Sequence, residues 1–404
     1  MRELIQVYLI IGFLLASVSW TVGQDIPYSE PDEVGMSAQR LAQIDKVLSE
    51  YVERREVPGF VTLIARSGKI VHWEAHGRIG IDIVKPMSKN AIFDVASMTK
   101  PITAISVMIL YEEGVLLLSD PISKFLPEFK SPLVQVNDNE LIPVNREVTV
   151  YDLLTHTSGG IKGDFSRIEK FTYPTLSDYM NDLAQTALQF QPGDQWLYDD
   201  SYDVLGYLVE VISGQRLDEF WQERIFGPLG MLDTHYWLPS DKEVRRPILL
   251  YNGRSDPQRI NRYPTLAAER KSTILGAGGL HTTVFDYWRF CQMLLNGGEL
   301  DGVRLLSNKT IDWMTINHIG DLEMANWVPQ GSRYGFGFGI IADPGKSTQP
   351  ISTGAYYWGG ALGTRFLIDS EEELICIIMA QVRPYNQLGY IQKFQAVVYS
   401  SLVD

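Results

Sequence analysis

The segment Ala96-Ser97-Met98-Thr99-Lys100-Pro101 opens an apolar stretch that continues to Gly114. Proline is tolerated best in the first turn of a helix, where backbone N–H groups have no intrahelical partner, so Pro101 predicts a helix that starts at or very near Ser97. Residues three apart are neighbours on a helix, which places the Lys100 ammonium beside the Ser97 hydroxyl. A hydroxyl beside an amine, at the positive end of a helix dipole, has the chemistry of an activated nucleophile. A Ser-x-x-Lys tetrapeptide also arises by chance on solvated helix faces, so the pattern needs support from the rest of the chain.

Length and composition place this chain among ordinary globular proteins. Its 404 residues are enough for a large core and for two or three domains. The hydrophobic share of 45% and the charged share of 21% are typical of soluble proteins. The net charge of −14, with no basic run against it, argues against nucleic acid or an anionic membrane as a partner.

The N-terminus has the pattern of a secretory signal peptide. An apolar run from Leu4 to Leu15 is followed by small residues, and cleavage is predicted after Ser19 or Gly23. We therefore expect residues 1–23 to direct export to the periplasm or the medium, and residues 24–404 to form the mature protein. The alternative is an uncleaved membrane anchor, for which the run is short, since a span needs about 20 residues.

The order of strand-like and helix-like segments predicts the fold. Near the N-terminus, residues 60–65 and 70–75 predict a hairpin, and near the C-terminus residues 364–368 and 374–380 predict further strands. Between them, from roughly 120 to 270, the chain reads as helical with long polar loops. This order predicts an α+β fold, in which an antiparallel sheet built from both chain ends is flanked by helices and an all-helical lobe is inserted.

Further segments are assigned from capping residues and periodicity. Ser37 is placed as the N-cap of a helix that reaches Tyr51, and Gly214 is placed to end a helix that starts near Tyr202. The apolar spacing of residues 391–398 predicts a closing amphipathic helix. The run Gly335-Phe336-Gly337-Phe338-Gly339 is interpreted as a return to β structure.

Cysteine and histidine give no metal or disulfide pattern. Cys291 and Cys376 lie in apolar contexts, which predicts two separate buried thiols. His72 and His76 fall on one face of a strand but have no carboxylate or cysteine partners at ligand spacing. We therefore expect no bound metal.

Two further stretches complete a recognisable set of motifs. One carries Tyr198 and the other carries Trp358-Gly359-Gly360. With the Ser97 stretch, they make the chain similar to the serine β-lactamase and penicillin-binding-protein superfamily, and within it most similar to the class C β-lactamase-like esterases, the family VIII carboxylesterases. The similarity covers nearly all of the mature chain, and although each motif alone is modest evidence, their order and spacing are specific. The supporting motifs are Leu154-Thr155-His156-Thr157-Ser158-Gly159, Asp203-Val204-Leu205-Gly206, Gly278-Gly279-Leu280 and Leu294-Leu295-Asn296-Gly297-Gly298-Glu299-Leu300.

The resemblance implies three catalytic residues. Ser97 would be the acylated nucleophile, and Lys100 and Tyr198 would share its proton. The chemistry needs such a pair, because a serine hydroxyl must lose its proton to attack a carbonyl. Free tyrosine and lysine both titrate near about 10, and a lysine cation beside a tyrosine favours the phenolate, which brings the pair nearer to neutral pH.

The resemblance also implies an oxyanion hole and a substrate-binding strand. The oxyanion hole would consist of the backbone N–H groups of Ser97 and Ala361. Gly359 and Gly360 would bind substrate by allowing it to approach the strand closely.

Two positions depart from the pattern of the β-lactamases and peptidases. Asp200 stands where they have an asparagine. Trp358 stands where their third motif begins with lysine, and the esterases also have a tryptophan at this position. We assign both to substrate binding, with a solvated or capping carboxylate as the alternative for Asp200 and a packed core ring as the alternative for Trp358. His156 is interpreted as structural.

The sequence therefore predicts an exported serine hydrolase that cleaves small-molecule carboxylic esters through an acyl-Ser97 intermediate, without metal or cofactor. One alternative is a β-lactamase or D-amino-acid peptidase or amidase that uses the same nucleophile. A second alternative is a non-catalytic binding protein of the same fold. An acyltransferase stays open as well, because an alcohol can replace water in resolving the same acyl-enzyme. No feature of the sequence fixes an oligomeric state.

Overall fold

The computed structural model describes residues 26–162, 173–251, 254–255 and 273–403. The predicted signal peptide and part of the predicted helical lobe lie outside the described residues. Among the helices that are described, none combines the length and the apolar composition needed to cross a bilayer.

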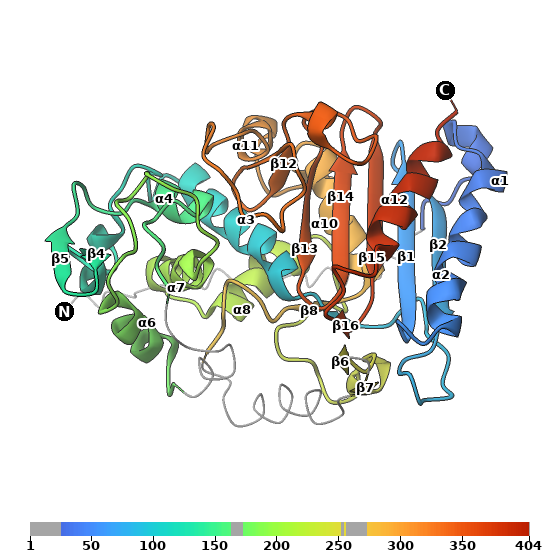
Figure 1. Ribbon diagram of the computed structural model, residues 1–404, viewed down its shortest axis with the longest axis horizontal. Coiled ribbons are helices and arrows are strands. Elements are labelled where there is room, and N and C mark those ends of the chain that lie inside the picture. The colour runs from blue at the N-terminus through green and yellow to red at the C-terminus, as the bar shows by residue number, and fades with distance from the viewer. Residues whose placement is uncertain (1–25, 163–172, 252–253, 256–272, 404) are drawn as a thin grey trace, which may run out of the picture.

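A seven-stranded antiparallel sheet forms the centre of the molecule, in the order β11-β12-β13-β14-β15-β1-β2 (Figure 1). Strands β1 (Gly59–Arg66) and β2 (Lys69–Gly77) come from the N-terminal part, and the other five come from the C-terminal part. The two parts join where β1 pairs with β15 along its length. The predicted α+β fold, with a sheet built from both chain ends, is confirmed. The remaining strands are β11 Ser332–Tyr334, β12 Gly339–Ile341, β13 Tyr356–Gly360, β14 Thr364–Asp369 and β15 Leu374–Met379.

Helices cover both faces of this sheet (Figure 1). Every residue of β15 is buried, and its sequence is a continuous apolar run, as expected for a strand covered on both faces. Helix α10 packs against β1 and β15, while α12 and α2 pack against one another and against the other side. The Ser37 side chain caps α1, as predicted, but the single helix predicted to reach Tyr51 is divided at Ala42 into α1 and α2. The bounds are α1 Ala38–Leu41, α2 Gln43–Glu53, α10 Val284–Leu295 and α12 Tyr390–Ser400.

Helix α3 (Thr99–Glu112) runs between the sheet and the helical lobe (Figure 1). The short 3-10 helix η2 (Ala96–Met98) leads into it, so the predicted start near Ser97 is confirmed. Residues 99–110 are all buried and mostly apolar, so this part of the helix has no exposed polar face. Gly114, with a φ of 73°, follows the last turn.

The lobe is mostly helical, but the expectation of an all-helical lobe needs a correction. Strands β4 (Leu133–Asn137) and β5 (Glu140–Pro143) form a hairpin at its outer end (Figure 1). Its turn contains Asn137, Asp138 and Asn139, residue types that favour tight turns, between strands that contain valine and isoleucine. Helix α7 ends at the left-handed Gly214, as predicted. The helices of the lobe are α4 Val150–Thr155, α6 Leu176–Ala184, α7 Ser201–Ser213, α8 Leu217–Trp221 and the π-helical turn η5 Gln222–Phe226.

The glycine-rich run at 335–339 is a turn and not a strand, which corrects the interpretation from sequence. Only Gly339 belongs to a strand, and residues 335–338 connect β11 to β12. Gly337 has a φ of 91°, and a Cβ atom there would lie 3.0 Å from the Ala104 side chain. Alternating glycines therefore bring this turn against α3.

Shorter elements complete the described chain. The short helices are η1 Pro31–Val34, η3 Ile122–Lys124, η4 Pro127–Phe129, η6 Glu243–Arg245, α11 Asn308–Met314 and η7 Pro344–Lys346. The short strands are β3 Phe93–Asp94, β6 Leu250–Tyr251, β7 Arg254–Ser255, β8 His281–Thr282, β9 Glu299–Leu300, β10 Val303–Arg304 and β16 Val382–Arg383.

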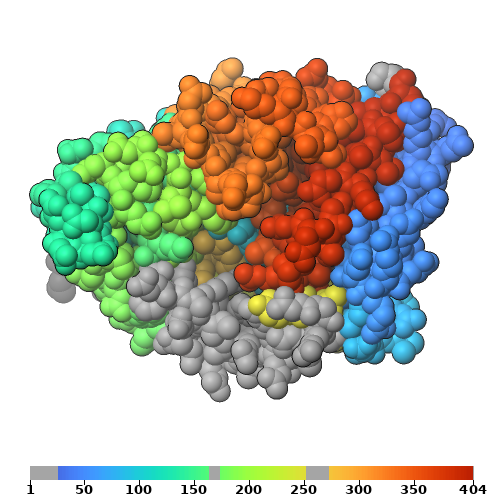
Figure 2. Space-filling model, in the orientation of Figure 1, coloured from blue at the N-terminus to red at the C-terminus, as the bar shows by residue number. Residues whose placement is uncertain are grey.

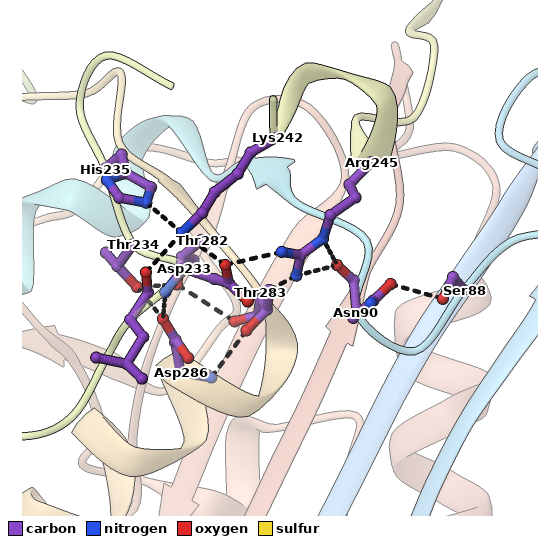
Figure 3. A network of polar contacts seen from close by, with 11 residues as sticks. Ser88, Asn90, Asp233, Thr234, His235, Lys242, Arg245, Thr282, Thr283 and Asp286 are labelled. Atoms are coloured by element: carbon purple, nitrogen blue, oxygen red, sulfur yellow. Dashed lines mark hydrogen bonds and ion pairs between the residues drawn. The ribbon is translucent and has the colours of Figure 1, made fainter. Parts of the chain in front are cut away.

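A polar network ties residues 233–245, which follow η5, to the start of α10 (Figure 3). The buried Asp286 carboxylate accepts hydrogen bonds from the Asp233 backbone N–H at 2.7 Å and from the Thr234 hydroxyl at 2.8 Å. Burial raises the pKa of Asp286 to about 6. Burial also disfavours the Asp233 carboxylate, but Arg245 and Lys242 outweigh it and lower the pKa of Asp233 to about 2.

The two carboxylates predict opposite pH dependences. In the unfolded chain Asp286 titrates near about 4, so its stabilising contribution is present below that pH and is lost as the pH rises through about 6. The unfolding free energy of Asp286→Asn relative to wild type should therefore rise between pH 4 and 7, by up to about 3 kcal/mol. Denaturant unfolding of both proteins between pH 4 and 7 measures this difference in unfolding free energy.

The matched control is Asp233→Asn. The stabilising contribution of Asp233 to the wild type is present above its unfolded pKa and is lost as the pH falls through about 2. The free energy of unfolding of Asp233→Asn, relative to wild type, should therefore fall as the pH rises from 2 to 4. A difference between Asp286→Asn and wild type that does not change with pH would contradict the assignment of a raised pKa to Asp286.

Candidate active site

Ser97 and Lys100 lie together at the start of α3. Lys100 is only 3% exposed, and its Nζ donates a hydrogen bond to the Ser97 Oγ at 3.4 Å. The same ammonium donates to the backbone carbonyl of Ala277 at 2.8 Å. The structure thus brings together the two residues that the helical spacing placed on one face.

The backbone just before Ser97 is strained. Ala96 has a φ of 45°, a left-handed conformation that costs a residue with a Cβ about 1–2 kcal/mol. The buried Asp94 carboxylate holds it there by accepting a hydrogen bond from the Ala96 N–H at 2.9 Å. Gly278 packs close to the Ala96 carbonyl, where a Cβ atom would lie at 3.3 Å. Such strain tends to cluster at functional sites, and neither Asp94 nor Ala96 carries a motif that reveals it from sequence.

Tyr198, in the loop before α7, lies next to the pair. The Lys100 Nζ is 4.5 Å from the centroid of the Tyr198 ring, which is the geometry of a cation over an aromatic face. The Tyr198 hydroxyl is buried and has no hydrogen-bond partner within the described part of the chain. All three predicted catalytic residues are therefore brought to one place, with a free hydroxyl at the tyrosine.

A buried network holds the Tyr198 segment. The next residue, Asp199, accepts hydrogen bonds from Ser158 Oγ at 2.8 Å and from the Ser201 N–H at 3.0 Å, and its Oδ1 lies 2.8 Å from His156 Nδ1. The His156 ring centroid is 4.7 Å from that of Tyr198. Burial lowers the pKa of His156, with Asp199 opposing it. His156 thus contacts and supports the Tyr198 ring, in line with its structural interpretation.

A second network holds the carbonyl that binds Lys100. The buried Asp203 of α7 accepts a hydrogen bond from the Ala277 N–H at 2.8 Å. One residue earlier, the Gly276 carbonyl accepts from the Thr103 hydroxyl of α3 at 2.7 Å. A Cβ atom on Gly276 would lie 2.1 Å from a backbone carbonyl of α7, so only glycine fits. Asp203 is a positioning residue that the sequence interpretation placed in a motif but gave no role.

Strand β13 forms the opposite wall. Strand β12 pairs with β13 only at Tyr356 and Tyr357, and η2 contacts β13 further along. A Cβ atom on Gly360 would lie 2.3 Å from the Val95 carbonyl, so glycine is required for this approach. Ala361 follows at an exposed position. In Figure 2 the start of α3, in teal, is visible at the bottom of a hollow between the green lobe and the orange and red segments.

Trp358 is a packed ring that borders this wall. It is 3% exposed, and its ring centroid lies 5.6 Å from that of Tyr198 and 5.1 Å from that of Tyr334. The half-exposed Trp327 completes the cluster at 6.1 Å. The Trp358 ring is therefore packed in the core, as the alternative interpretation expected, and it also lies beside Tyr198.

Asp200 lies at the N-cap position of α7 without making a side-chain cap. Its carboxylate accepts a hydrogen bond from the buried Tyr179 hydroxyl at 3.3 Å. This contact directs one oxygen toward α6, and the predicted role of Asp200 in substrate binding stays a prediction.

The described residues contain no cluster of three or more His, Cys, Asp and Glu side chains that is suited to a metal ion. Cys291 and Cys376 are free and buried in α10 and β15. His72 lies 2.8 Å from the Thr62 hydroxyl, and burial lowers its pKa to about 3.

Comparison with known proteins places this geometry in a family. The family model described as Beta-lactamase matches residues 44–396. The chain belongs to the β-lactamase family. The resemblance predicted from the motifs is thereby confirmed.

Relatives within the β-lactamase family match most of the chain. Protein Rv1367c of Mycobacterium tuberculosis is 33% identical, over 81% of this chain and 86% of that protein. Esterase EstB of Burkholderia gladioli is 27% identical, over 84% of this chain and 90% of EstB. The solved structure of EstCE1, described as a hydrolase with promiscuous acyltransferase activity, superposes with a TM-score of 0.76 at 22% identity, over 89% of this chain and 99% of EstCE1, and supports the fold. The chain is therefore a member of the β-lactamase-like serine hydrolases.

Because β13 approaches η2 closely, alanine substitutions at two adjacent glycines of this strand should have different effects on activity. Gly360→Ala places a methyl group 2.3 Å from both the Val95 carbonyl and the Thr364 hydroxyl, so β13 must move away from η2. The methyl group of Gly359→Ala meets its nearest neighbour, a backbone carbonyl, at 3.2 Å, which a small shift accommodates. We expect Gly360→Ala to lower kcat/KM for an ester at least about 100-fold, because a displacement of about 1 Å has that effect on catalysis.

Gly359→Ala should lose much less activity. Thermal unfolding of both variants separates a local displacement from a loss of folding. If both variants lost kcat/KM equally, the close packing of Gly360 would not be the reason for the loss of activity in Gly360→Ala.

Proposed function

We propose that the chain is an exported serine hydrolase that cleaves carboxylic esters through an acyl-Ser97 intermediate. The observation that carries the proposal is the position of the Lys100 ammonium, 3.4 Å from the Ser97 Oγ and 4.5 Å from the centre of the Tyr198 ring. Lys100 therefore lies beside both of the hydroxyl-bearing residues that take part in the proposed proton transfer. Export is proposed because of the apolar run from Leu4 to Leu15.

Acylation starts when the Ser97 Oγ attacks the ester carbonyl carbon and its proton passes to the Lys100–Tyr198 pair. The negative charge that develops on the carbonyl oxygen is held by the backbone N–H groups of Ser97 and Ala361. The C–O bond to the alcohol then breaks, and the departing oxygen takes the proton from the pair. The acyl group stays on Ser97.

Deacylation repeats these steps with water. The Lys100–Tyr198 pair takes a proton from the water, which attacks the acyl carbonyl carbon. The bond to Ser97 Oγ breaks, the serine recovers its proton, and the carboxylic acid leaves. No metal or cofactor takes part in this scheme.

Trp358 favours an ester over a β-lactam or a peptide C-terminus. The β-lactamases and peptidases have a lysine cation at this position, and their substrates carry a carboxylate. Here the side chain is an indole packed among Tyr198, Tyr334 and Trp327. The likeness to Esterase EstB supports the same choice. A β-lactamase or D-amino-acid peptidase with the same nucleophile is the competing proposal.

The Lys100–Tyr198 pair predicts non-additive kinetics. Lys100→Ala and Tyr198→Phe should each lower kcat for an ester by roughly 100-fold or more, as expected for a lost acid–base group. The double variant should lose little more than the worse single variant, because the two residues act as one unit. Steady-state kinetics of the four proteins measure this. A double variant that loses the full product of the single losses would show that the two residues act separately.

The Trp358 position predicts the substrate class. An ammonium about 4 Å from a carboxylate contributes about 4 kcal/mol at an effective dielectric of 20, and about 1.4 kcal/mol is already tenfold in rate. We expect kcat/KM for a neutral short-chain p-nitrophenyl ester to exceed that for nitrocefin by at least about 100-fold. Trp358→Lys should reduce the ratio of kcat/KM for the ester to kcat/KM for nitrocefin.

The control is Ser97→Ala, which should lose turnover of both substrates while keeping its thermal stability. Comparable wild-type efficiency on the ester and on nitrocefin would favour the β-lactamase proposal instead.

A further inference from the structure

The turn that precedes the nucleophile is held on both sides of one residue. Ala96 has a left-handed φ of 45°, which a residue with a Cβ atom rarely adopts. Its N–H donates a hydrogen bond to the Asp94 carboxylate at 2.9 Å, and its carbonyl accepts one from the Thr99 hydroxyl at 2.7 Å. The Asp94 contact is an Asx-turn, in which a side chain bonds the backbone two residues on. Both polar groups of the Ala96 backbone are therefore held by buried side chains.

The segment 278–280 packs against this turn and fixes the residues around it. A Cβ atom on Gly278 would lie 3.3 Å from the Ala96 carbonyl. The Val95 N–H donates to the Leu280 carbonyl at 3.0 Å, and the Leu280 N–H donates to the Thr99 hydroxyl at 3.2 Å. Because the neighbours on each side are fixed, the conformation of Ala96 decides the direction of the next peptide bond.

That peptide bond carries the Ser97 N–H, one of the two donors of the proposed oxyanion hole. A trans peptide is a rigid plane in which the N–H and the C=O point in opposite directions. The carbonyl of this plane belongs to Ala96 and is bound by Thr99. Rotation of Ala96 out of its left-handed conformation would therefore turn the Ser97 N–H away from its present direction.

The second donor of the proposed oxyanion hole depends on the same turn. A Cβ atom on Gly360 would lie 2.3 Å from the Val95 carbonyl, and the Thr364 hydroxyl lies 3.5 Å from that oxygen. Ala361, whose N–H is the second donor, follows Gly360 directly. Both donors are thus placed by contacts of the turn that begins at Asp94.

We propose that Asp94 is a positioning residue for the oxyanion hole. By accepting the Ala96 N–H it keeps Ala96 left-handed, and Ala96 in turn keeps the Ser97 N–H directed at the carbonyl oxygen of the substrate. The inference rests on the proposed acyl-Ser97 mechanism and adds a residue to it. Because the oxyanion develops only in the transition state, the loss of Asp94 lowers kcat more than it raises KM.

Substitutions at two positions test this role with the mature chain and a short-chain p-nitrophenyl ester. Asp94→Ala removes the acceptor and should lower kcat at least about tenfold, with a change in KM of less than about threefold. Asp94→Asn keeps an acceptor oxygen and should retain most of kcat.

Ala96→Gly should rescue the loss, because glycine adopts the left-handed conformation without a side chain to hold it. Added to Asp94→Ala, it should raise kcat at least about threefold, and in the presence of Asp94 it should raise kcat much less. If Ala96→Gly raises kcat no more without Asp94 than with it, the inference is overturned.

Ser131 provides a matched control at the outer end of the lobe. It is exposed and has a left-handed φ of 57°, so Ser131→Gly relieves the same kind of backbone strain away from the site. Added to Asp94→Ala, Ser131→Gly should not restore kcat. If it restores kcat as well as Ala96→Gly does, Asp94 contributes to folding only and the inference fails.

Thermal unfolding shows whether each variant is folded. If Asp94→Ala does not fold, Thr99→Val removes the hydrogen bond on the other side of Ala96 and should show the same loss of kcat and the same rescue by Ala96→Gly. If the wild type hydrolyses no ester, the proposed function fails. If the wild type hydrolyses the ester and folded Asp94→Ala keeps its kcat, only this inference fails.

Discussion

The buried ammonium of Lys100 is the group on which the rest of the site depends. A charge taken out of water needs close partners, and an unpaired one is strongly destabilising. Its partners are Ser97, one turn earlier, and two groups from distant parts of the chain, the Ala277 carbonyl and the face of the Tyr198 ring. The fold must therefore bring these three segments together around one cation.

The surrounding structure is rigid where this arrangement requires it. Asp203 fixes the Ala277 backbone, the His156–Asp199 pair fixes the loop that carries Tyr198, and Asp94 fixes the strained Ala96 before the nucleophile. Each of these is a buried polar group that hydrogen-bonds to the segment that it holds. In a site of this kind the reacting atoms are positioned before the substrate arrives, which reduces the cost of reorganisation during the reaction.

The sheet supplies the other half of the site. Because β1 pairs with β15, the two chain ends form one rigid layer, and β13 is set two strands from β15 at a fixed register. Gly360 allows that strand to approach η2 closely, and Arg365 of the neighbouring strand presents its charge beside Gly359. In the proposed mechanism the two sides of the hollow have different tasks: proton transfer on the lobe side, and substrate contacts on the strand side.

The sequence alone determined the features that depend on local chemistry. Pro101 and the apolar periodicity predicted α3, Gly214 predicted the end of α7, and the strand-like runs at 60–65 and 70–75 predicted the hairpin β1–β2, because caps, turns and periodicity act over a few residues. The motif spacing also identified Ser97, Lys100 and Tyr198 as the catalytic candidates, and the structure brings these three together.

Only the tertiary structure decided the contacts between residues far apart in the chain. The partnership of Lys100 with the Ala277 carbonyl spans 177 residues, and no local pattern encodes it. Among the described residues that line a cavity beside β13, Arg365 is the one charged side chain, which sequence order does not reveal. Residues 335–339 were interpreted as β structure, but packing against α3 made most of them a turn. In each of these cases the deciding energy comes from burial and from partners that only the folded chain provides.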